Sequence, residues 1–299
     1  MMLSVIHSIL EINQKGIILC IILLLILNQN QFIKQNIIHY GRNKDNRMKS
    51  GWLTISKKKF NCFYLFLIVT NLLFVSFNFF YKNQLLIEYN LDINYYSKYY
   101  NTNTISEHAI YLPLLLQFQG FRRYYETIKI HQFSANSKMN VLILLLGIYY
   151  YFNLSLLLNF NAVLSYAIYK QNHTSLTTDV TFYFSIALFF YSSYHQFNCH
   201  VDLANLRNND IKEKYSLPLT SYFKYCSNPH YYHELLIYLS FLLMDQFKSL
   251  NLIFISLLVV LNLIITAYSN HHWYFENMPK YKHIVKNRHA ILPQMAWFY

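Results

Sequence analysis

The sequence predicts an all-α, polytopic membrane protein with about seven transmembrane helices, a lumenal N-terminus and a cytosolic C-terminus. The first observation behind this prediction is composition: of 299 residues, 55% are hydrophobic and only 13% are charged. An ordinary soluble domain is less apolar and more charged. The second observation is a series of apolar runs, several of which approach the ~20 residues that cross a bilayer. The third is an alternating distribution of basic residues.

The apolar runs supply the predicted spans in chain order. The first run, residues 17–27, lacks a small-residue cleavage site and continues into a basic loop, so we expect a retained span and no removed signal. The third run is weaker than the others and ends at Arg122 and Arg123. The complete set of runs is 17–27, 60–80, 108–121, 141–167, 180–194, 231–244 and 250–268.

Lysines and arginines gather in alternate connectors between these runs, within residues 34–59, 122–138, 207–224 and 280–288. Such alternation is typical of the positive-inside rule and places these connectors in the cytosol. It also explains the net charge of +12 without a nucleic-acid partner. Of the 25 Lys and Arg residues, five fall on the opposite side: Lys15, Lys82, Lys98, Lys170 and Lys248.

Several classes of site are disfavoured by the residues that would have to build them. The chain has five glycines and no G-x-G-x-x-G or Walker loop, so any nucleotide must be held by side chains. The four cysteines show no C-x-x-C spacing, which argues against a zinc ribbon or a disulfide framework. We find no internal repeat or flexible linker and predict one integrated membrane domain. Its two parts are residues 1–107, with a basic cytosolic loop and a lumenal loop, and the C-terminal membrane region 108–299.

The first polar cluster, HQFNCHVDLANLRNN at 195–209, ends the fifth predicted span. In a continuing helix, Gln196, His200 and Arg207 share one face with Leu203. The guanidinium offers a fixed fork for a phosphate or carboxylate, while Gln and His can orient an amide or ribose. The alternative is a solvated helix end.

The second cluster begins SNPHYYHE at 227–234. Ser227 or Asn228 is expected to cap a helix that has Pro229 in its first turn, and His230 and Glu234 become i, i+4 neighbours. A helix start facing a basic crevice is suited to an anion. The alternative is a His and Glu pair that only satisfies itself at the membrane interface.

Two further clusters complete the cytosolic side. The tail at 269–293 carries Asn270, His271 and Tyr274 and then Lys286 and Arg288, in a pattern that also suits an interfacial helix. The stretch at 116–126 ends the third span with Arg122, Arg123 and Glu126, which alone indicates a stop signal with an ion pair.

These four stretches, in this order, resemble the steroid 5-alpha-reductase family, and most closely its polyprenol (polyprenal) reductase branch. The resemblance runs from about residue 115 to 293. It lies in QGFRRYYE (119–126), HQFNCHVDLANLRNN (195–209), PLTSYFKYCSNPHYYHELLIYLS (218–240) and the segment from HHWYF to YKHIVKNRHAILP (271–293).

The resemblance implies a seven-helix, multi-pass reductase of the endoplasmic reticulum membrane that uses NADPH. The implied reaction saturates the alpha-isoprene double bond of polyprenol or polyprenal in dolichol biosynthesis, which supports protein N-glycosylation. It implies an isoprenoid lipid substrate, no metal and no obligate protein partner. The implied cofactor residues are Gln196, His200, Asn205, Arg207, His230, Glu234, Asn270, His271 and Tyr274, and the candidate catalytic residues are Tyr274, Glu126 and Arg123.

From these assignments we expect Gln196, Arg207, Glu234 and Tyr274 to line a common cavity. Within the same superfamily, a 3-oxo-5-alpha-steroid 4-dehydrogenase or a trans-2-enoyl-CoA reductase is the alternative activity. A di-iron oxygenase fits poorly, because the thirteen histidines do not form the H-x-x-x-H and H-x-x-H-H boxes that such centres need. The alternative from another class is a non-enzymatic subunit of a membrane complex.

Overall fold

The structure is a computed structural model that describes residues 8, 15, 16, 18, 54–91, 106–133, 137–172, 180–209 and 216–291. Long α-helices dominate this part of the chain, and the sheet found in it is one antiparallel ribbon of two strands. The elements are β1 (Thr54–Ser56), a 3-10 turn (Lys57–Phe60), α3 (Asn61–Leu91), a 3-10 turn (Glu107–Tyr111), α5 (Leu112–Tyr125), a π-helical turn (Glu126–Ile130), β2 (Lys138–Asn140), α6 (Val141–Asn172), α7 (Val180–Asn209), a 3-10 turn (Ser221–Lys224), α8 (Pro229–Met244), α9 (Leu250–Asn277), a 3-10 turn (Pro279–Tyr281) and α10 (Lys282–Lys286).

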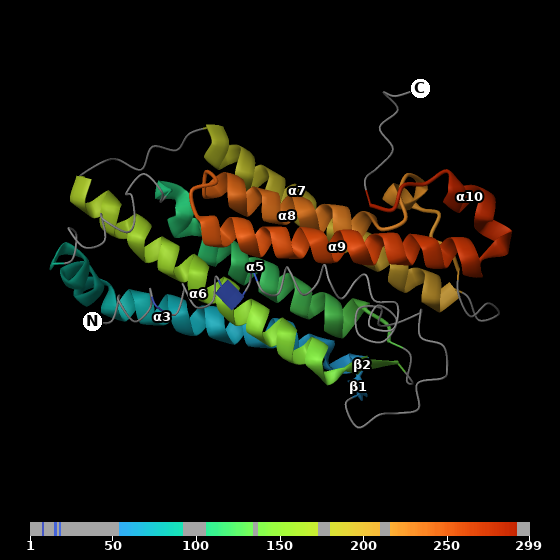
Figure 1. The fold of residues 1–299 in the computed structure, drawn as a ribbon, viewed down its shortest axis with the longest axis horizontal. Coiled ribbons are helices and arrows are strands. Elements are labelled where there is room, and N and C mark those ends of the chain that lie inside the picture. The colour runs from blue at the N-terminus through green and yellow to red at the C-terminus, as the bar shows by residue number, and fades with distance from the viewer. Residues whose placement is uncertain are drawn as a thin grey trace.

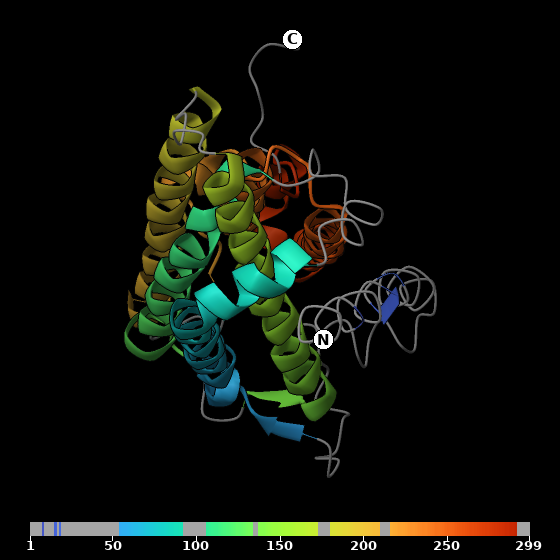
Figure 2. The same cartoon turned by 90° about the vertical axis from the view of Figure 1, so that its left-hand side faces the viewer.

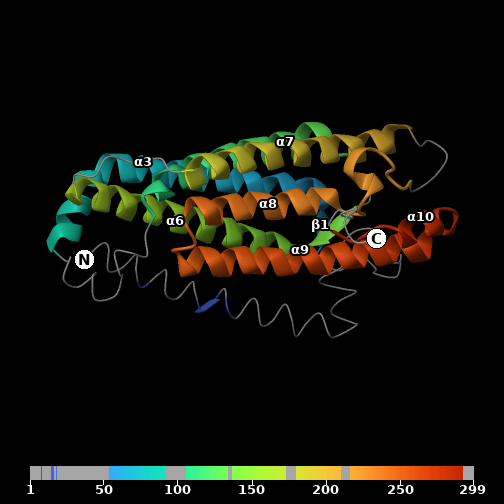
Figure 3. The ribbon, with the colours of Figure 1, turned by 90° about the horizontal axis from the view of Figure 1, so that it is seen from above.

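The long helices alternate in direction along one axis (Figures 1 and 3). α3, α6 and α8 begin at the end where α5, α7 and α9 finish, and β1, β2 and α10 lie at this same end. The ribbon pairs Ile55 with Met139 and so holds the beginning of α3 beside that of α6. In the view along the bundle, the two strands lie at its edge (Figure 2). We call this end the strand end. The four predicted polar clusters lie here, at the ends of α5, α7 and α9 and at the start of α8.

Within the described residues, three helices are long and apolar enough to cross a membrane: Lys57–Tyr81, Val141–Tyr166 and Leu250–Asn277. Their outer surfaces fit a lipid environment, since Leu73, Phe79 and Phe80 on α3 are 62%, 66% and 77% exposed. The predicted runs from 60 onward all appear as helices. However, α5 and α8, with 14 and 16 residues, fall short of the usual ~20. The first predicted span, 17–27, lies outside the described residues, so seven spans and their orientation stay a prediction.

The core lies where the six long helices meet. Phe189 of α7 stacks on Phe241 of α8 at 5.7 Å between ring centroids, and both are almost fully buried. Close approach of α6 to α3 depends on Gly147, because a Cβ at that position would lie 2.5 Å from the ring of Phe63. These contacts set how α3, α6, α7 and α8 lie against one another, and so help to fix the positions of the polar groups at the strand end.

A belt of asparagines joins α3, α5 and α6 inside the apolar part of the bundle. Asn71 donates to the carbonyl of Pro113 at 2.9 Å and to Oε1 of Gln117 at 2.8 Å. Asn159 donates to Oδ1 of Asn71 at 2.8 Å and accepts from Asn78 at 3.3 Å. Interhelical hydrogen bonds of this kind contribute about 0.6–2 kcal/mol each in a membrane. The belt therefore fixes how α3 sits against α5, which carries part of the site.

α8 begins at Pro229, which confirms the predicted helix start. The predicted side-chain cap is wrong, because neither Ser227 nor Asn228 bonds a helix N–H. Asn228 instead donates to the carbonyls of Ala267 and Ala290 at 3.1 and 2.9 Å. Its Oδ1, the atom that would accept a helix N–H, instead accepts from Asn270 at 3.1 Å, so the side chain of Asn228 ties α8 to α9 and to the chain after α10.

Candidate functional site

Glu126 is the centre of a buried ionic cluster at the strand end. It follows the last residue of α5, and its side chain has no exposed surface. Oε1 accepts from Arg122 and Oε2 accepts from Arg123, which the helix delivers at i−4 and i−3. Nδ1 of His200 on α7 lies 2.7 Å from Oε2. We call Arg122, Arg123, Glu126 and His200 the Glu126 cluster.

Gln196 connects this cluster to α8. Nη2 of Arg122 donates to Oε1 of Gln196 and, at 2.8 Å, to Oε1 of Gln119. The amide nitrogen of Gln196 donates to Oε2 of Glu234 and, at 3.2 Å, to the carbonyl of His230. Three helices are thus joined by a continuous chain of hydrogen bonds in which two arginines face two glutamates.

Arg123 extends the network to α3. Its Nε and Nη2 donate to the hydroxyl oxygen of Tyr64 at 3.2 and 2.9 Å. Gly120, one turn earlier on α5, permits this approach, because a Cβ there would lie 3.2 Å from Ile68 and 3.3 Å from Leu67. The guanidinium is almost fully buried, so its position is set by these partners.

A small cavity adjoins the network and changes character along its length. The side chains nearest the strand end are polar, and those one turn further along α3, α5 and α8 are largely apolar. The lining thus presents polar groups at one end and mainly apolar groups at the other. The lining residues are Tyr64, Leu67, Leu116, Gln119, Arg123, Tyr151, Glu234, Ile237, Tyr238 and Phe241.

The electrostatics of the Glu126 cluster keep its carboxylate ionised. Burial alone would raise the pKa of Glu126, but Arg123, the hydrogen bond with His200 and Arg122 together hold that pKa well below its usual range. Burial and the neighbouring Arg123 lower the pKa of His200, so its imidazole is neutral at pH 7. Buried charges are tolerated here because each has a bonded partner.

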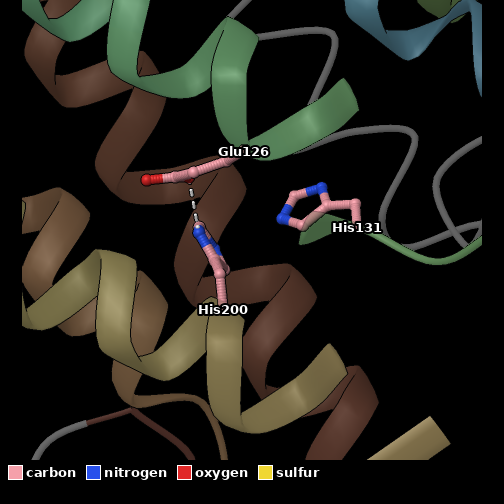
Figure 4. Close-up of side chains that lie close together, drawn as sticks. All are labelled: Glu126, His131 and His200. Atoms are coloured by element: carbon pink, nitrogen blue, oxygen red, sulfur yellow. Dashed lines mark hydrogen bonds and ion pairs between the residues drawn. The ribbon is translucent and has the colours of Figure 1, made fainter. Parts of the chain in front are cut away.

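His131 completes a group that has the composition of a metal site. Ligand atoms of Glu126, His131 and His200 all lie within 4.8 Å of one another. Figure 4 shows Glu126 and His200 pointing toward each other, with His131 beside them from the segment after the π-helical turn. However, both oxygens of Glu126 already bond guanidinium groups, and Nη1 of Arg123 lies 2.7 Å from Nδ1 of His200. Two fixed positive charges make this group a poor site for a cation.

Arg288 marks a second polar region at the strand end. It lies after α10, is 5% exposed, and its Nε and Nη1 have no hydrogen-bond partner among the described residues. Tyr274 of α9 interacts with it electrostatically. Buried guanidinium donors without partners are costly unless a ligand satisfies them. An anionic group such as a phosphate has the charge and acceptors to do so.

The end of α9 and the start of α8 surround Arg288 with further polar groups. Asn270 donates to Oδ1 of Asn228 at 3.1 Å. Oγ of Ser227 and Nδ1 of His271 lie 2.8 Å apart. We call Ser227, Asn228, Asn270, His271, Tyr274 and Arg288 the Arg288 region. The predicted cofactor, NADPH, carries an amide and phosphates. The Glu126 cluster and the Arg288 region both offer hydrogen-bond donors for such groups.

The predicted site residues divide between the two regions. Arg123, Glu126, Gln196, His200 and Glu234 form one network, to which His230 contributes its carbonyl.

Asn270, His271 and Tyr274 belong to the Arg288 region, where Tyr274 packs with Leu217, Met278 and Val285. Asn205 is exposed on α7, and the side chain of Arg207 lies outside the described residues. The expected common cavity of Gln196, Arg207, Glu234 and Tyr274 is not found in the part described: Glu234 lines the cavity, whereas Tyr274 lies on α9, which contributes no lining residue.

Tyr64 and Gln119 are the polar members of the network that sequence reasoning missed. Tyr64 lies in an apolar run, and the chain has 29 tyrosines, so nothing in the sequence marks this tyrosine as a site residue. Gln119 stands one turn before the arginines within QGFRRYYE, and its i, i+3 spacing to Arg122 is the signal that could have found it.

The fold and these regions define a helical bundle with membrane-length helices and a buried polar site at one end. Residues 137–296 match the family described as 3-oxo-5-alpha-steroid 4-dehydrogenase, and this match covers more than half of the chain. The chain belongs to this family, the steroid 5-alpha-reductase family.

Several relatives carry the name polyprenal reductase. The chain is 29% identical over 266 residues to Polyprenal reductase of Xenopus tropicalis, covering 83% of this chain and 84% of the relative. It is 33% identical over 179 residues to Polyprenal reductase of Saccharomyces cerevisiae, covering 58% and 60%. It is 26% identical over 209 residues to Polyprenal reductase 1 of Oryza sativa subsp. indica, where the match covers 62% of this chain and 58% of the relative's length.

Proposed function

We propose that this protein is an NADPH-dependent reductase of the endoplasmic reticulum membrane that saturates the alpha-isoprene double bond of polyprenal in dolichol biosynthesis, and so supports protein N-glycosylation. The name shared by the relatives supports the substrate. The observation that carries the proposal is the buried network from Glu126 through Arg122 and Gln196 to Glu234, beside a cavity that is polar at one end and apolar at the other.

A reduced nicotinamide, when bound, supplies a hydride to the substrate carbon. The Arg288 region is suited to a phosphate of the cofactor through the unpaired Nε and Nη1 of Arg288. Glu234 lines the cavity and is suited to accept from an amide, and Gln196, which donates to Oε2 of Glu234, holds that carboxylate in place. We place His200, His230, Asn205, Arg207, Asn270, His271 and Tyr274 in the cofactor site as the family resemblance implies.

The candidate catalytic residues take different tasks in this proposal. Arg123 faces the cavity and offers positive charge where negative charge develops on the substrate. Glu126 is not among the residues that line the cavity; its role is to hold Arg123 in position through their ion pair. Tyr274 lies with Arg288 and serves the cofactor. The apolar side chains deeper in the cavity are suited to contact with the isoprenoid part of the substrate.

The direct test uses the purified full chain in lipid nanodiscs with polyprenal and NADPH deuterated at the transferred position. We expect a product with a saturated alpha-isoprene unit and one deuterium at the β carbon, identified by mass spectrometry. The steroid enone and enoyl-CoA substrates of the superfamily serve as competitors under the same conditions. No reduction of any of the three, with the protein held in a stable complex, would support the non-enzymatic alternative and overturn the proposal.

Cofactor binding is tested separately by titrating NADPH into variants. Glu234→Ala is expected to abolish binding, while Glu276→Ala, an exposed change at the end of α9, is expected to leave it unchanged. Arg288→Ala should raise the dissociation constant by about 10–100-fold, as expected for loss of hydrogen bonds to a charged group. Retained binding in Glu234→Ala undoes the site assignment.

The steroid alternative has its own support in the description of the matching family. A steroid enone presents the same conjugated carbonyl but a rigid ring system. Faster turnover of the steroid than of polyprenal in the competition would assign that activity in place of the isoprenoid one.

A further inference from the structure

We propose that Tyr238 donates the proton that completes the reduction, to the α carbon of the substrate, and that Tyr150 holds its hydroxyl in place for this step. The inference rests on the proposed function, because it requires an unsaturated aldehyde in the cavity. Hydride transfer to one carbon of a C=C bond leaves the other carbon in need of a proton, which a positioned side chain can supply.

Tyr238 lies in the cavity wall at the level where the reacting carbons are expected. Glu234 and Tyr238 both line the cavity, and Tyr238 follows one turn later on α8, about 6 Å further from the strand end. Arg123 lines the polar end, where the carbonyl oxygen is placed. The α and β carbons follow that oxygen along the substrate. With the oxygen at Arg123 and the tail toward Phe241, these carbons lie beside Tyr238.

The hydroxyl of Tyr238 has a partner that leaves its proton free. It is hydrogen-bonded to the hydroxyl of Tyr150 on α6, and either oxygen can be the donor. When Tyr150 donates, the O–H of Tyr238 is free to point into the cavity, because a phenol accepts through its lone pairs and keeps its own proton. The same bond stabilises the phenolate that remains once that proton has left. Tyr150 is therefore a positioning residue for Tyr238.

Packing fixes the ring of Tyr238 before a substrate arrives. The residue is 5% exposed, and its ring meets that of Phe241 edge-on at 6.0 Å between centroids. Phe241 in turn stacks on Phe189 of α7. A proton donor that is held in this way reaches the substrate from one fixed direction.

Electrons and protons balance over one turnover. A hydride from the reduced nicotinamide, with its electron pair, forms a C–H bond at the β carbon. The C=C π pair moves between the α carbon and the carbonyl carbon, and the carbonyl π pair moves onto oxygen. The oxygen pair then re-forms C=O, while the π pair at the α carbon takes the proton of Tyr238, whose O–H pair stays on its own oxygen. Water that enters after the product leaves returns a proton to this phenolate.

Other polar groups on the cavity wall are less suited to this step. The guanidinium of Arg123 and the amide of Gln119 do not give up a proton. The carboxylate of Glu234 acts as an acceptor. The oxygen of Tyr64 accepts from Arg123, at the end where the carbonyl oxygen is placed. Tyr151 packs against Tyr64 with 5.6 Å between ring centroids, and no hydroxyl is found to bond its own in the part of the chain that is described.

The stereochemistry of the product tests the inference. The full chain in lipid nanodiscs reduces polyprenal with unlabelled NADPH in D2O, and borohydride converts the aldehyde at once to the alcohol, which prevents exchange at the α carbon. The α carbon then carries one deuterium, whose position relative to the new β centre is read by deuterium NMR. A fixed donor gives one α epimer, whereas protonation by free water gives both.

We expect Tyr238→Phe to lower kcat about 100-fold, as for loss of a general acid, and to give both α epimers. KM and the affinity for NADPH should change less than about threefold, because the phenol acts in the transition state. Tyr150→Phe keeps the donor, so kcat should fall only about tenfold and a single epimer should remain. Tyr268→Phe is the control: Tyr268 of α9 is 64% exposed, and this variant should match the unsubstituted protein.

A single α epimer from Tyr238→Phe, whatever its rate, overturns the inference while leaving the proposed function intact. Both epimers from the unsubstituted protein would also overturn it, and that result does not depend on whether any variant folds. Absence of turnover by the unsubstituted protein instead defeats the proposed function, and this inference with it.

Discussion

Replacement of Glu126 by glutamine tests the buried ionic cluster with a small change of shape. The carboxylate is completely buried and bonded to Arg122, Arg123 and His200. Glutamine keeps the volume but removes the charge and turns one acceptor into a donor that faces another donor. Breaking a buried pair while its partner stays costs about 3–5 kcal/mol, because a buried cation is left uncompensated. We expect Glu126→Gln to lose stability of that order.

The assay is equilibrium unfolding in mixed detergent micelles, followed by tryptophan fluorescence. Glu276→Gln is the control, since Glu276 is exposed and its replacement should change the free energy of unfolding by less than about 0.5 kcal/mol. A Glu126→Gln protein as stable as this control would refute a cluster in which the carboxylate balances two arginines.

The pH dependence follows from the same contacts. Because the folded protein holds the pKa of Glu126 below its usual range, the stabilisation is present above the unfolded pKa of about 4.3. It declines as the pH falls below that value toward the folded pKa. The stability difference between the unsubstituted protein and Glu126→Gln should thus be constant from about pH 7 to 5 and shrink below about pH 4. A difference that grows on acidification contradicts the assignment.

Three other substitutions probe the surroundings of the site. Arg123→Lys keeps the charge but loses the two-point bond to Tyr64, so kcat should fall about tenfold in the polyprenal assay with little change in cofactor affinity. Gly147→Ala places a Cβ 2.5 Å from the ring of Phe63 and should cost about 1–3 kcal/mol in the unfolding assay. Asn71→Ala removes one of the two acceptors of the Asn159 amide, which keeps the carbonyl of Ser155, and should cost about 1–3 kcal/mol, while activity per folded molecule is retained.

The helices were predictable because a long apolar run indicates a segment that is buried or in contact with lipid, and such a segment is helical in a membrane. The run 141–167 lies within α6, and the run 250–268 forms the N-terminal two thirds of α9. Pro229 marked the start of α8 because a missing N–H is harmless only in a first turn. Helix ends were harder to predict: α3 continues to Leu91, well beyond the end of the predicted run 60–80.

The site was predictable where its residues share a helix and harder to predict where they meet across helices. Arg122, Arg123 and Glu126 stand at i, i+3 and i+4 spacings, so their ion pairs follow from helical geometry. The bond between Arg123 and Tyr64 joins residues 59 positions apart. No local pattern encodes it, because it depends on how closely α3 and α5 pack. Asn228 occupies the predicted N-cap position, but its side chain does not cap the helix, because its hydrogen-bond partners lie on distant segments.

The asparagine belt has a consequence for the order in which the protein is made. Asn71 emerges from the ribosome first, Gln117 follows 46 residues later, and Asn159 follows 88 residues after Asn71. Until those partners arrive, the amide of α3 has no interhelical bond and is costly in lipid. We therefore expect α3 to reach its final packing only after α6 has been synthesised, because the belt cannot form before Gln117 and Asn159 are present.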